Sequence, residues 1–427
     1  MTTSDTSRAP LSRYAIVLGL LTAIGPSAID MYLPALPAIG RALGADAHAV
    51  QASLMAFFIA TGAGQLVAGP LSDMFGRKRP MYVGLAVFVL ASIGCALAPG
   101  IGTLIAFRFL QGLGACACMV TPRAVVRDLH TGTEAARLMS LLILVYSVSP
   151  ILAPLVGSLV AEAAGWRAVF WVIGALAVLA VAMVAALLPE TRPPAARAQS
   201  SLRGAMAGYG VLLRDRHFLA VAFMASLTLS GFFVYVANSS FVMSTHFGVS
   251  PRLYAVLFAL NAVSMIVASQ FNARLAARFG IRRVLRTAVA VHAGVAAVLL
   301  VLTLAGVDRL GVLVALLMVV YGLNGVIVPS AFVVAMEGHA ARAGTASALL
   351  GTLNFAGGAV VVALVSPFAD GTPLPMVAGI AGCSLAVVVL ALRGLRVPPV
   401  LAPVLAPSLA PAPASSVKAP PASEACR

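Results

Sequence analysis

Twelve long apolar stretches separated by short polar segments constrain the fold of this chain more than any other feature. A helix needs about 20 consecutive apolar residues to cross the hydrocarbon core of a bilayer. Of the 427 residues, 61% are hydrophobic and only 10% are charged, which lies outside the range of soluble domains. The expected fold class is therefore an all-α membrane protein of about twelve transmembrane helices. The spans are predicted near residues 14–38, 48–70, 80–98, 101–123, 137–161, 166–188, 217–243, 252–275, 284–305, 310–333, 343–366 and 374–393.

The longest polar interruption, residues 190–216, divides the predicted spans six and six. It contains prolines and a series of arginines, a composition typical of a linker. We therefore expect an N-terminal six-helix half at 14–189 and a C-terminal six-helix half at 217–395. Residues 1–13 are predicted to be a short cytoplasmic N-terminus, and the Pro- and Ala-rich residues 396–427 a disordered cytoplasmic tail. The first apolar run is too long for a secretory signal and is expected to be retained.

The basic residues lie almost entirely on one side of the predicted spans. With a cytoplasmic N-terminus, 23 Lys and Arg residues fall in cytoplasmic segments and four fall on the other side. Cytoplasmic loops of membrane proteins carry such an excess. We therefore expect a multi-pass protein of the bacterial cytoplasmic (inner) membrane with both termini inside. The formal net charge of +15 then reflects these loops, and no nucleic acid partner is expected.

Several chemistries are excluded by residues that the sequence lacks. Only Lys78 and Lys418 are lysines, and no Gly-Lys-Ser/Thr sequence provides a phosphate-binding loop for ATP. No lysine lies in an apolar span to carry a Schiff base. The five cysteines lack a Cys-x-x-Cys spacing and the six histidines lack paired ligand spacing, so we expect no metal site and no disulfide framework. Neither a cofactor nor enzymatic activity is expected.

Residues Gly69–Pro80 form a short charged segment between the second and third predicted spans. One helix is expected to end near Pro70 and the next to begin near Pro80. The glycines suit close backbone approach or a positive φ, and Asp73 is placed to accept from helix N-terminal amides or to pair with an arginine. Such a pair would latch one arrangement of a helix bundle, whereas the alternative is a basic loop that only sets orientation. The predicted latch residues are Gly69, Asp73, Gly76, Arg77, Lys78 and Arg79.

Two ionisable residues inside the predicted spans, Asp30 and Arg108, are candidate functional groups, because charges are rarely placed in a bilayer without a function. A carboxyl group in poorly hydrated surroundings can bind and release a proton near neutral pH. The alternative for Asp30 is a wetted or capping residue at a helix end. Arg108 needs a carboxylate, carbonyl groups or water, and its nearest candidate partners are Asp30 and Gln111. The alternative for Arg108 is a structural role, tied to backbone carbonyls.

Small, polar and aromatic residues in other spans indicate packing and cavity positions. Pro150, Pro154 and Gly157 predict a kinked and closely packed fifth span. Asparagines and aromatic residues of the C-terminal spans either line a cavity or bond a neighbouring helix. The candidate substrate-cavity residues are Tyr32, Gln111, Phe232, Tyr235, Asn238 and Asn354, with Phe233, Asn261 and Asn324 as further positions.

The segment from Gly69 to Lys78 resembles the signature loop of the major facilitator superfamily, whose pattern is roughly Gly-x-x-x-Asp-x-x-Gly-Arg-Lys. This resemblance implies a secondary transporter of two six-helix halves. A related segment with Arg274 and Gly280 occupies the corresponding place in the second half, as an internal repeat would require. Ala277 stands there where Asp73 would fall, so any ion-pair latch belongs to the first half.

The fifth span resembles in part the antiporter motif of the drug-exporting branch, Gly-x-x-x-Gly-Pro-x-x-Gly-Gly. Pro154 and Gly157 match this motif, whereas Ser149, Ala153 and Ser158 replace glycines. The resemblance supports antiport without establishing it.

Four segments together resemble the Bcr/CflA branch, the bicyclomycin-resistance type of drug/proton antiporters. They are Ile29–Pro37, Gly69–Lys78, Arg108–Gly112 and Ala343–Ser347. This resemblance implies a monomer in the lipid bilayer that exports small drug-like or antibiotic molecules by alternating access, driven by inward proton flow. As a hypothesis of our own, proton and substrate compete for Asp30, and Arg108 biases its pKa.

Two further functions are weighed against this one. An exporter of an endogenous metabolite, such as an amino acid or sugar, would use the same fold, and nothing in the cavity residues names a ligand. A non-transporting receptor or scaffold would need a soluble domain or a long structured loop, and the sequence contains neither between its spans.

Overall fold

The structure, a computed structural model of the protein, describes residues 11–198, 200–339 and 342–394. Over these residues it is helical and contains no β-strand. Twelve helical spans are long and apolar enough to cross a membrane, so the predicted all-α membrane fold is confirmed. The predicted tail at 396–427 and most of the predicted N-terminus at 1–13 lie outside the described residues.

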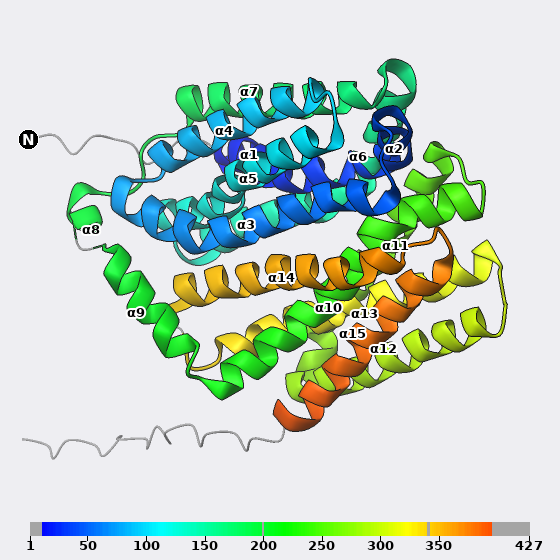
Figure 1. Cartoon of the computed structure of the whole chain (residues 1–427). Coiled ribbons are helices and arrows are strands. Elements are labelled where there is room, and N and C mark those ends of the chain that lie inside the picture. Colours follow the sequence, from blue (N-terminus) through cyan, green and yellow to red (C-terminus); the bar gives the residue numbers. More distant parts are fainter. Residues whose placement is uncertain (1–10, 199, 340–341, 395–427) are drawn as a thin grey trace, which may run out of the picture. The chain divides into compact units, whose positions relative to one another are not determined.

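The spanning helices follow one another along the chain in two sets of six (Figure 1). The first set is α1 (Leu11–Asp30), α3 (Ala47–Phe75), α4 (Lys78–Ala96), α5 (Ile101–Leu129), α6 (Gly132–Ala164) and α7 (Trp166–Leu187). The second set is α10 (Arg216–Phe241), α11 (Pro251–Phe279), α12 (Ile281–Leu304), α13 (Leu310–Met336), α14 (Ala343–Val365) and α15 (Pro373–Gly394). A helix satisfies its backbone hydrogen bonds internally, which an apolar bilayer requires.

The first span is not a single helix, contrary to the prediction of one helix over 14–38. After α1 come a 3-10 turn, η1 (Leu33–Ala35), and a short helix, α2 (Leu36–Leu43). Pro34 and Pro37 explain the break, because proline lacks the N–H of an intrahelical hydrogen bond and its ring clashes with the preceding turn. Asp30 therefore sits at an irregular piece of backbone inside the span.

The second span is longer than predicted. Pro70 does not end it, because α3 continues through this proline to Phe75. The helix stops at Gly76, whose φ of +88° a helix cannot contain. The following helix α4 begins at Lys78, so the connection between the two spans is only two residues long.

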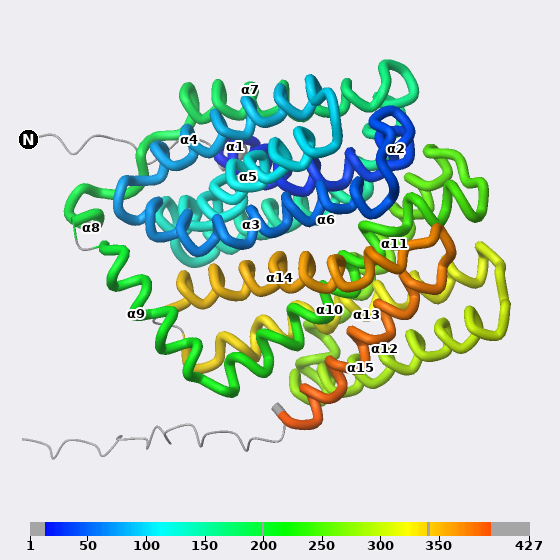
Figure 2. The backbone as a smooth tube through the Cα atoms, viewed as in Figure 1, coloured from blue at the N-terminus to red at the C-terminus, as the bar shows by residue number. Residues whose placement is uncertain are grey.

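Within each set the helices pack side by side (Figure 2). In the first set, α1 contacts α5, α6 and α7, α4 packs against α5 and α7, and α3 packs along α5. In the second set, α10 contacts α13, α14 and α15, while α12 contacts α13 and α15. Most contacts between the sets are made by two helix pairs, α3 with α14 and α6 with α11. We call the boundary along these two pairs the seam.

Small residues bring backbones together along the α3–α14 side of the seam. A Cβ atom added at Gly62 would lie 3.1 Å from the Ala356 amide nitrogen and 3.2 Å from the Thr352 carbonyl oxygen. The Thr352 hydroxyl donates to the Gly62 carbonyl at 2.8 Å. Gly351 faces the side-chain amide of Gln65. Glycine at helix interfaces permits such close approach in membranes.

Two short helices connect the sets. They are α8 (Pro194–Ala198) and α9 (Leu202–Leu212). The Ser201 hydroxyl caps α9 by accepting from the Gly204 amide at 3.1 Å. In Figure 1, α9 crosses the ends of the spanning helices, and the Tyr209 hydroxyl donates to the Leu66 carbonyl of α3 at 3.0 Å. The connection between the sets therefore rests on α3 at its linker end.

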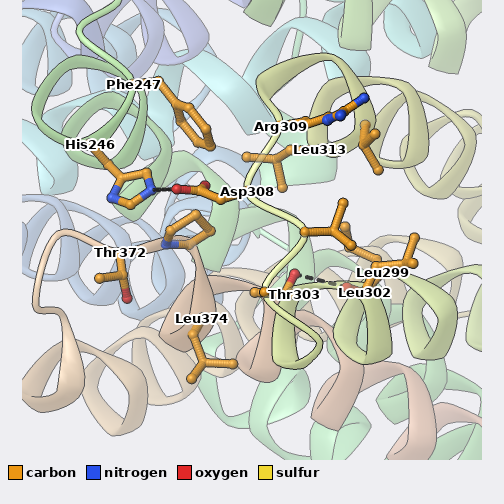
Figure 3. Close-up of a pocket in the computed structure, with 14 residues that line it drawn as sticks. His246, Phe247, Leu299, Leu302, Thr303, Asp308, Arg309, Leu313, Thr372 and Leu374 are labelled. Atoms are coloured by element: carbon orange, nitrogen blue, oxygen red, sulfur yellow. Dashed lines mark hydrogen bonds and ion pairs between the residues drawn. The ribbon is translucent and has the colours of Figure 1, made fainter.

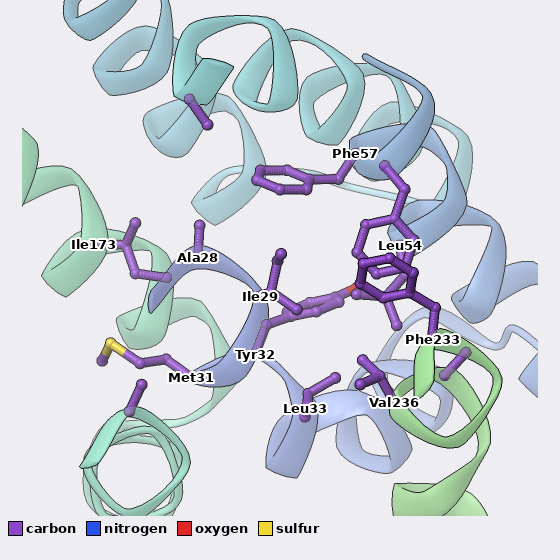
Figure 4. Packing of buried hydrophobic residues seen from close by; sticks show 14 of the residues in the cluster. Ala28, Ile29, Met31, Tyr32, Leu33, Leu54, Phe57, Ile173, Phe233 and Val236 are labelled. Atoms are coloured by element: carbon purple, nitrogen blue, oxygen red, sulfur yellow. The ribbon is translucent and has the colours of Figure 1, made fainter. Parts of the chain in front are cut away.

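Aromatic rings fill the space beside the break in the first span (Figure 4). The ring of Tyr32 is fully buried, with its centroid 5.4 Å from that of Phe170. Across the seam, the ring of Phe58 lies 4.5 Å from that of Phe233 in α10 and 6.0 Å from that of Phe355 in α14. The apolar core is therefore continuous from one set of helices to the other.

Candidate functional site

Asp30, at the end of α1, is a buried carboxylate that is only 5% exposed. No hydrogen bond or opposite charge from the described residues compensates its burial. The turn η1, which closely follows Asp30, packs against both α6 and α11. Because α6 and α11 form one side of the seam, the carboxylate faces the boundary between the two sets of helices.

The helix α6 holds the break next to Asp30 in place. A Cβ atom added at Gly157 would collide with the backbone of Met31, including its carbonyl oxygen. Pro150 and Pro154 both lie inside α6, which continues through them as one helix. The three predicted motif residues therefore lie on a helix that packs directly against the break, and Gly157 is the point of closest approach.

Arg108 of α5 is completely buried. Its Nη1 donates to the Ala28 carbonyl of α1 at 3.0 Å and to Oε1 of Gln111 at 2.6 Å. The guanidinium also lies over two rings, 4.6 Å from the centroid of Tyr32 and 4.4 Å from that of Phe57. Such cation–π contacts are strongest when the cation is desolvated.

The expected contact between Arg108 and Asp30 is not formed, which corrects that part of the prediction. Arg108 is bound to the carbonyl of Ala28 instead, two residues before Asp30. Its Nε and Nη2 atoms are buried and have no partner among the described residues. Arg108 therefore positions the end of α1 through the backbone, and it keeps two donors unused.

Three of the predicted cavity residues are engaged inside the protein. The hydroxyls of Tyr32 and Ser53 share a hydrogen bond of 2.7 Å. Gln111 donates from Nε2 to the Ser92 hydroxyl at 2.8 Å, so it lies within the first set of helices. Asn238 accepts from Gln51 Nε2 at 3.0 Å, a contact between α10 and α3. Each of these three side chains is therefore hydrogen-bonded to another part of the helix bundle, and for Asn238 this is the predicted alternative to a cavity position.

The second set of helices contains a group of packed rings, which we call the aromatic cluster: Phe232 and Tyr235 of α10, Phe258 of α11 and Tyr321 of α13. The ring of Tyr235 stacks on Phe258 with centroids 5.6 Å apart and lies 4.9 Å from Tyr321. Phe232 is 5.5 Å from Tyr321 and only partly buried. Phe258 and Tyr321 were absent from the predicted cavity, because isolated aromatic residues in apolar runs resemble ordinary core. Asn354 of α14 has a buried Oδ1 without a partner among the described residues.

Arg77 is the centre of the signature segment. It is only 3% exposed, and its guanidinium pairs with Asp73 at 2.8 Å and with Asp128 of α5 at 2.6 Å. Burial alone would lower the pKa of Arg77, but the hydrogen bonds and charges of Asp128 and Asp73 outweigh it and raise that pKa. Asp128 lies 51 positions further along the chain, and no local pattern marks it as a partner of this segment.

Glu190, which follows α7, fastens the linker to the same segment. Its carboxylate accepts from the backbone amides of Arg77 at 2.8 Å and Lys78 at 3.1 Å. Burial raises the pKa of Glu190, but these amides, the Arg192 amide and the charge of Arg197 more than offset it, so the pKa lies below its ordinary value. Of the two alternatives predicted for Asp73, pairing with an arginine is the one observed, and Glu190 is the carboxylate that accepts from the helix N-terminal amides.

The other predicted latch residues differ from one another. Gly76 has a positive φ, and a Cβ atom there would lie within 3 Å of the Glu190 carboxylate. Both the positive φ and the close approach predicted for this glycine are therefore present. Gly69 lies in α3 with open space around it, so the expected close approach there is wrong. Lys78 lies over the ring of Tyr82 at 5.7 Å, and Arg79 is exposed.

A separate cavity of about 130 Å³ opens at the end of the second set opposite the linker (Figure 3). His246 Nε2 and Asp308 Oδ2 lie 2.6 Å apart on its rim, and Leu299, Leu302, Leu313 and Leu374 form its apolar wall. None of the predicted site residues lines this cavity. In the described part of the chain, no three His, Cys, Asp or Glu side chains are grouped as metal ligands.

Comparison with known proteins identifies relatives over most of the chain. The family model described as Major Facilitator Superfamily matches residues 18–362. An uncharacterized MFS-type transporter of Bacillus subtilis, YdgK, is 38% identical over 364 residues, which cover 85% of this chain and 90% of that protein. A bicyclomycin resistance protein homolog of Haemophilus influenzae is 32% identical over 87% of this chain and 93% of its own length.

Two further comparisons extend this result. A chloramphenicol resistance protein of Pseudomonas aeruginosa is 33% identical over 62% of each chain. Among solved structures, a mutant of the nucleoside transporter NupG superposes with a TM-score of 0.71 at 16% identity, covering 90% of this chain and 99% of that one. At this identity the superposition shows a shared fold alone.

Proposed function

The chain belongs to the major facilitator superfamily, and we propose that it exports small drug-like or antibiotic molecules by alternating access, in exchange for protons. Two relatives named for resistance to bicyclomycin and chloramphenicol support a drug-like substrate. We also propose that the protein works as a monomer in a bacterial cytoplasmic membrane. Both termini are proposed to lie inside, because 23 of its basic residues would then face the cytoplasm and four the outside.

The observation that carries the proposal is the position of Asp30. It is a buried carboxylate without a compensating partner among the described residues, it lies at a break in a spanning helix, and it faces the seam. A group in this position can be reached from either side of the membrane as the two halves move, which is the requirement for a coupling site near the bilayer midplane.

The proposed cycle uses competition for Asp30. In the outward-open state, a proton from outside neutralises the carboxylate. After the protein turns inward, the proton leaves to the cytoplasm, and the ionised or vacated site then accepts substrate. Arg108 tunes this exchange by holding the end of α1 through the Ala28 carbonyl and by placing a positive charge nearby.

The ion pairs around Arg77 are proposed to stabilise the outward-facing arrangement. They tie the end of α3 to the end of α5 through Asp128, and Asp73 also lies 3.6 Å from Arg192 of the linker. Because α9 of the linker contacts both α3 and α14, a movement of the second half pulls on this group of charges. The halves are proposed to be residues 14–189 and 217–395, joined by the linker 190–216.

The proposal is tested in everted membrane vesicles with an acid interior and a pH-sensitive dye. Addition of chloramphenicol, bicyclomycin or a fluorescent dye is expected to release protons from the lumen. Asp30→Asn is expected to reduce this release at least tenfold while the protein remains folded and inserted, because the amide cannot bind a proton. Asp370→Asn, which changes an exposed carboxylate, is the matched control and is expected to behave as the wild type.

Three outcomes would contradict parts of this proposal. Proton release that persists in Asp30→Asn removes this residue from the coupling mechanism. A response to an amino acid or sugar, with none to drugs, identifies a metabolite exporter instead. Silence of the folded wild type towards the whole panel rejects proton-coupled export of these compounds.

A further inference from the structure

Two polar atoms beside the aromatic cluster are buried without a partner. The Tyr321 hydroxyl and the Oδ1 atom of Asn261 have no hydrogen bond among the described residues, although Tyr321 is only 1% exposed and Asn261 only 2%. Asn261 donates from Nδ2 to the Tyr235 hydroxyl at 2.9 Å, which brings it next to the rings. Burying an unpaired polar group costs free energy, so each such atom in a native protein requires an explanation.

The chemistry of the two atoms is specific. Asn261 already uses its Nδ2 group on Tyr235 and on the Leu257 carbonyl, so its Oδ1 can only accept. A tyrosine hydroxyl both donates and accepts. Tyr235 links the two residues, because its hydroxyl accepts from Asn261 at 2.9 Å and its ring lies 4.9 Å from that of Tyr321. The region therefore offers one free acceptor and one free donor–acceptor beside aromatic rings. The complementary molecule carries a hydroxyl or an amide next to a flat apolar group.

The surroundings favour an uncharged molecule. The aromatic cluster is built from α10, α11 and α13, and the acidic residues of these helices and their flanking loops lie at helix ends: Asp215, Asp308 and Glu337. Only Asp30, across the seam near Tyr254, supplies a buried carboxylate in this region of the described chain. A quaternary cation has no N–H or O–H to donate, so it would leave the Asn261 oxygen unpaired.

The position of the cluster gives a substrate access during the transport cycle. Phe258 and Asn261 lie on α11, which forms the seam with α6, and Phe232 is only partly buried. A movement that separates α6 from α11 would uncover this face of α11 and the neighbouring rings.

We propose that Tyr321 and Asn261 recognise the polar head of the substrate, and that the preferred substrate is an aryl compound bearing hydroxyl groups and not a quaternary cation. This rests on the export function proposed above and assigns specificity within it. Neither residue carries the proton, so substitutions of Tyr321 and Asn261 are expected to change substrate binding while Asp30 still binds a proton.

The first test measures binding without transport. The full-length protein in detergent is heated with chloramphenicol, which has an aryl ring, two hydroxyls and an amide, or with its di-O-acetylated form, which keeps the ring and the amide but has no hydroxyl. We expect chloramphenicol to raise the Tm of the wild type and the acetylated form to raise it much less. Tyr321→Phe is expected to weaken chloramphenicol binding about tenfold, since one buried hydrogen bond is lost, and to leave the weak binding of the acetylated form unchanged.

Tyr14→Phe is the matched control, because Tyr14 lies near the start of α1, where its ring packs against His130, and belongs to none of the proposed sites. It is expected to keep the wild-type preference between the two compounds. Asn261→Leu provides a second variant of the site and is expected to lose the preference, as Tyr321→Phe does.

Several results would overturn the assignment. Equal binding of chloramphenicol by wild type and Tyr321→Phe means that the hydroxyl holds a bound water only. Stabilisation by tetraphenylphosphonium and not by chloramphenicol means that the substrate class is cationic. If chloramphenicol binds with the expected dependence on Tyr321 but moves no protons in vesicles, recognition stands and the proposed export function fails.

Discussion

At the scale of single residues, the clearest requirement is for glycine at position 76. Its φ of +88° lies in the region that residues with a side chain rarely adopt, and the Glu190 carboxylate occupies the space where a Cβ would be. The signature segment resembles a pattern with two glycines, Gly69 and Gly76, yet only the second one has this requirement.

We therefore predict opposite results for two equal substitutions. Gly76→Ala should destabilise the protein by about 2 kcal/mol or more, because it combines an unfavourable φ with loss of the Glu190 contacts. Gly69→Ala should be neutral or stabilise by up to about 1 kcal/mol, because alanine favours a helix with free space around it. Thermal unfolding of both purified variants measures the difference. Equal losses in the two variants would show that Glu190 does not hold Gly76 in place.

Arg108 shows what a residue type alone does not reveal. A buried arginine needs partners, and the sequence correctly predicts that need. The sequence also names Gln111 as a candidate partner, and the structure confirms this contact. It does not identify the Ala28 carbonyl, which is available only when α1 packs against α5 in this register. The same applies to Tyr321, whose hydroxyl is unusual only because nothing in the described chain bonds it.

At the scale of helices, the contact between α6 and the break in the first span links two features that lie far apart in the sequence. Gly157 allows the α6 backbone to touch Met31, next to Asp30. The sequence shows the prolines of α6 and of the first span. It does not show that α6 contacts the break at Gly157 and Met31.

Gly157→Ala is predicted to disturb this contact. The added methyl would collide with the Met31 carbonyl, so α6 and the break must move apart and Asp30 must shift with them. We expect a reduction of substrate-induced proton release of tenfold or more, with the protein still inserted. Gly174→Ala in α7 is the matched control, because its Cβ would meet only the Ser92 side chain, at an ordinary 3.4 Å. Normal activity of Gly157→Ala would mean that this close approach plays no part in transport.

The number of spanning helices could be predicted from the sequence better than the residues at which they end. The twelve spans follow from local hydropathy, and the structure confirms them. The ends of helices are less predictable: Pro70 was expected to end α3 and does not, whereas Pro34 and Pro37 do interrupt the first span. A proline is tolerated in a spanning helix where neighbouring helices compensate the lost hydrogen bond, and the sequence alone does not show that packing.

At the scale of the whole molecule, the linker is attached to the first set of helices by electrostatics. Glu190 accepts from two backbone amides, and Arg197 lies 3.7 Å from its carboxylate. Asp128 and Glu190 are 51 and 113 positions from Arg77, so the group forms only after the helices assemble. No pattern in the signature segment itself predicts that Asp128 and Glu190 bind there.

The lowered pKa of Glu190 predicts a pH dependence for this attachment. A carboxyl group with a lowered pKa in the folded state stabilises the protein above its ordinary pKa of 4.5, and this stabilisation is lost as the pH falls through the lowered value. Glu190→Gln should therefore have a lower Tm than the wild type at neutral pH, and the difference should disappear in acid. Scanning calorimetry or nanoscale fluorimetry from about pH 7 to 3.5 measures it.

Glu337→Gln provides the comparison for this experiment. The Glu337 carboxylate pairs with Arg282 at 2.7 Å on the protein surface. Exposed pairs of this kind contribute little to stability, so we expect a smaller difference in Tm at every pH. A difference for Glu190→Gln that did not change with pH would show that the charge of Glu190 is not what attaches the linker.

The attachment of Glu190, Arg192 and Arg197 also limits how far the two sets of helices can travel. A polar segment such as residues 190–216 could form a flexible linker, but its first part is bound to the ends of α3 and α4. What remains to span the gap is mainly α9, a rigid segment of 11 residues, or about 16 Å at 1.5 Å per residue. A helix of fixed length then sets the distance between the attached part of the linker and the start of α10. We therefore expect the second set to rotate relative to the first without separating from it.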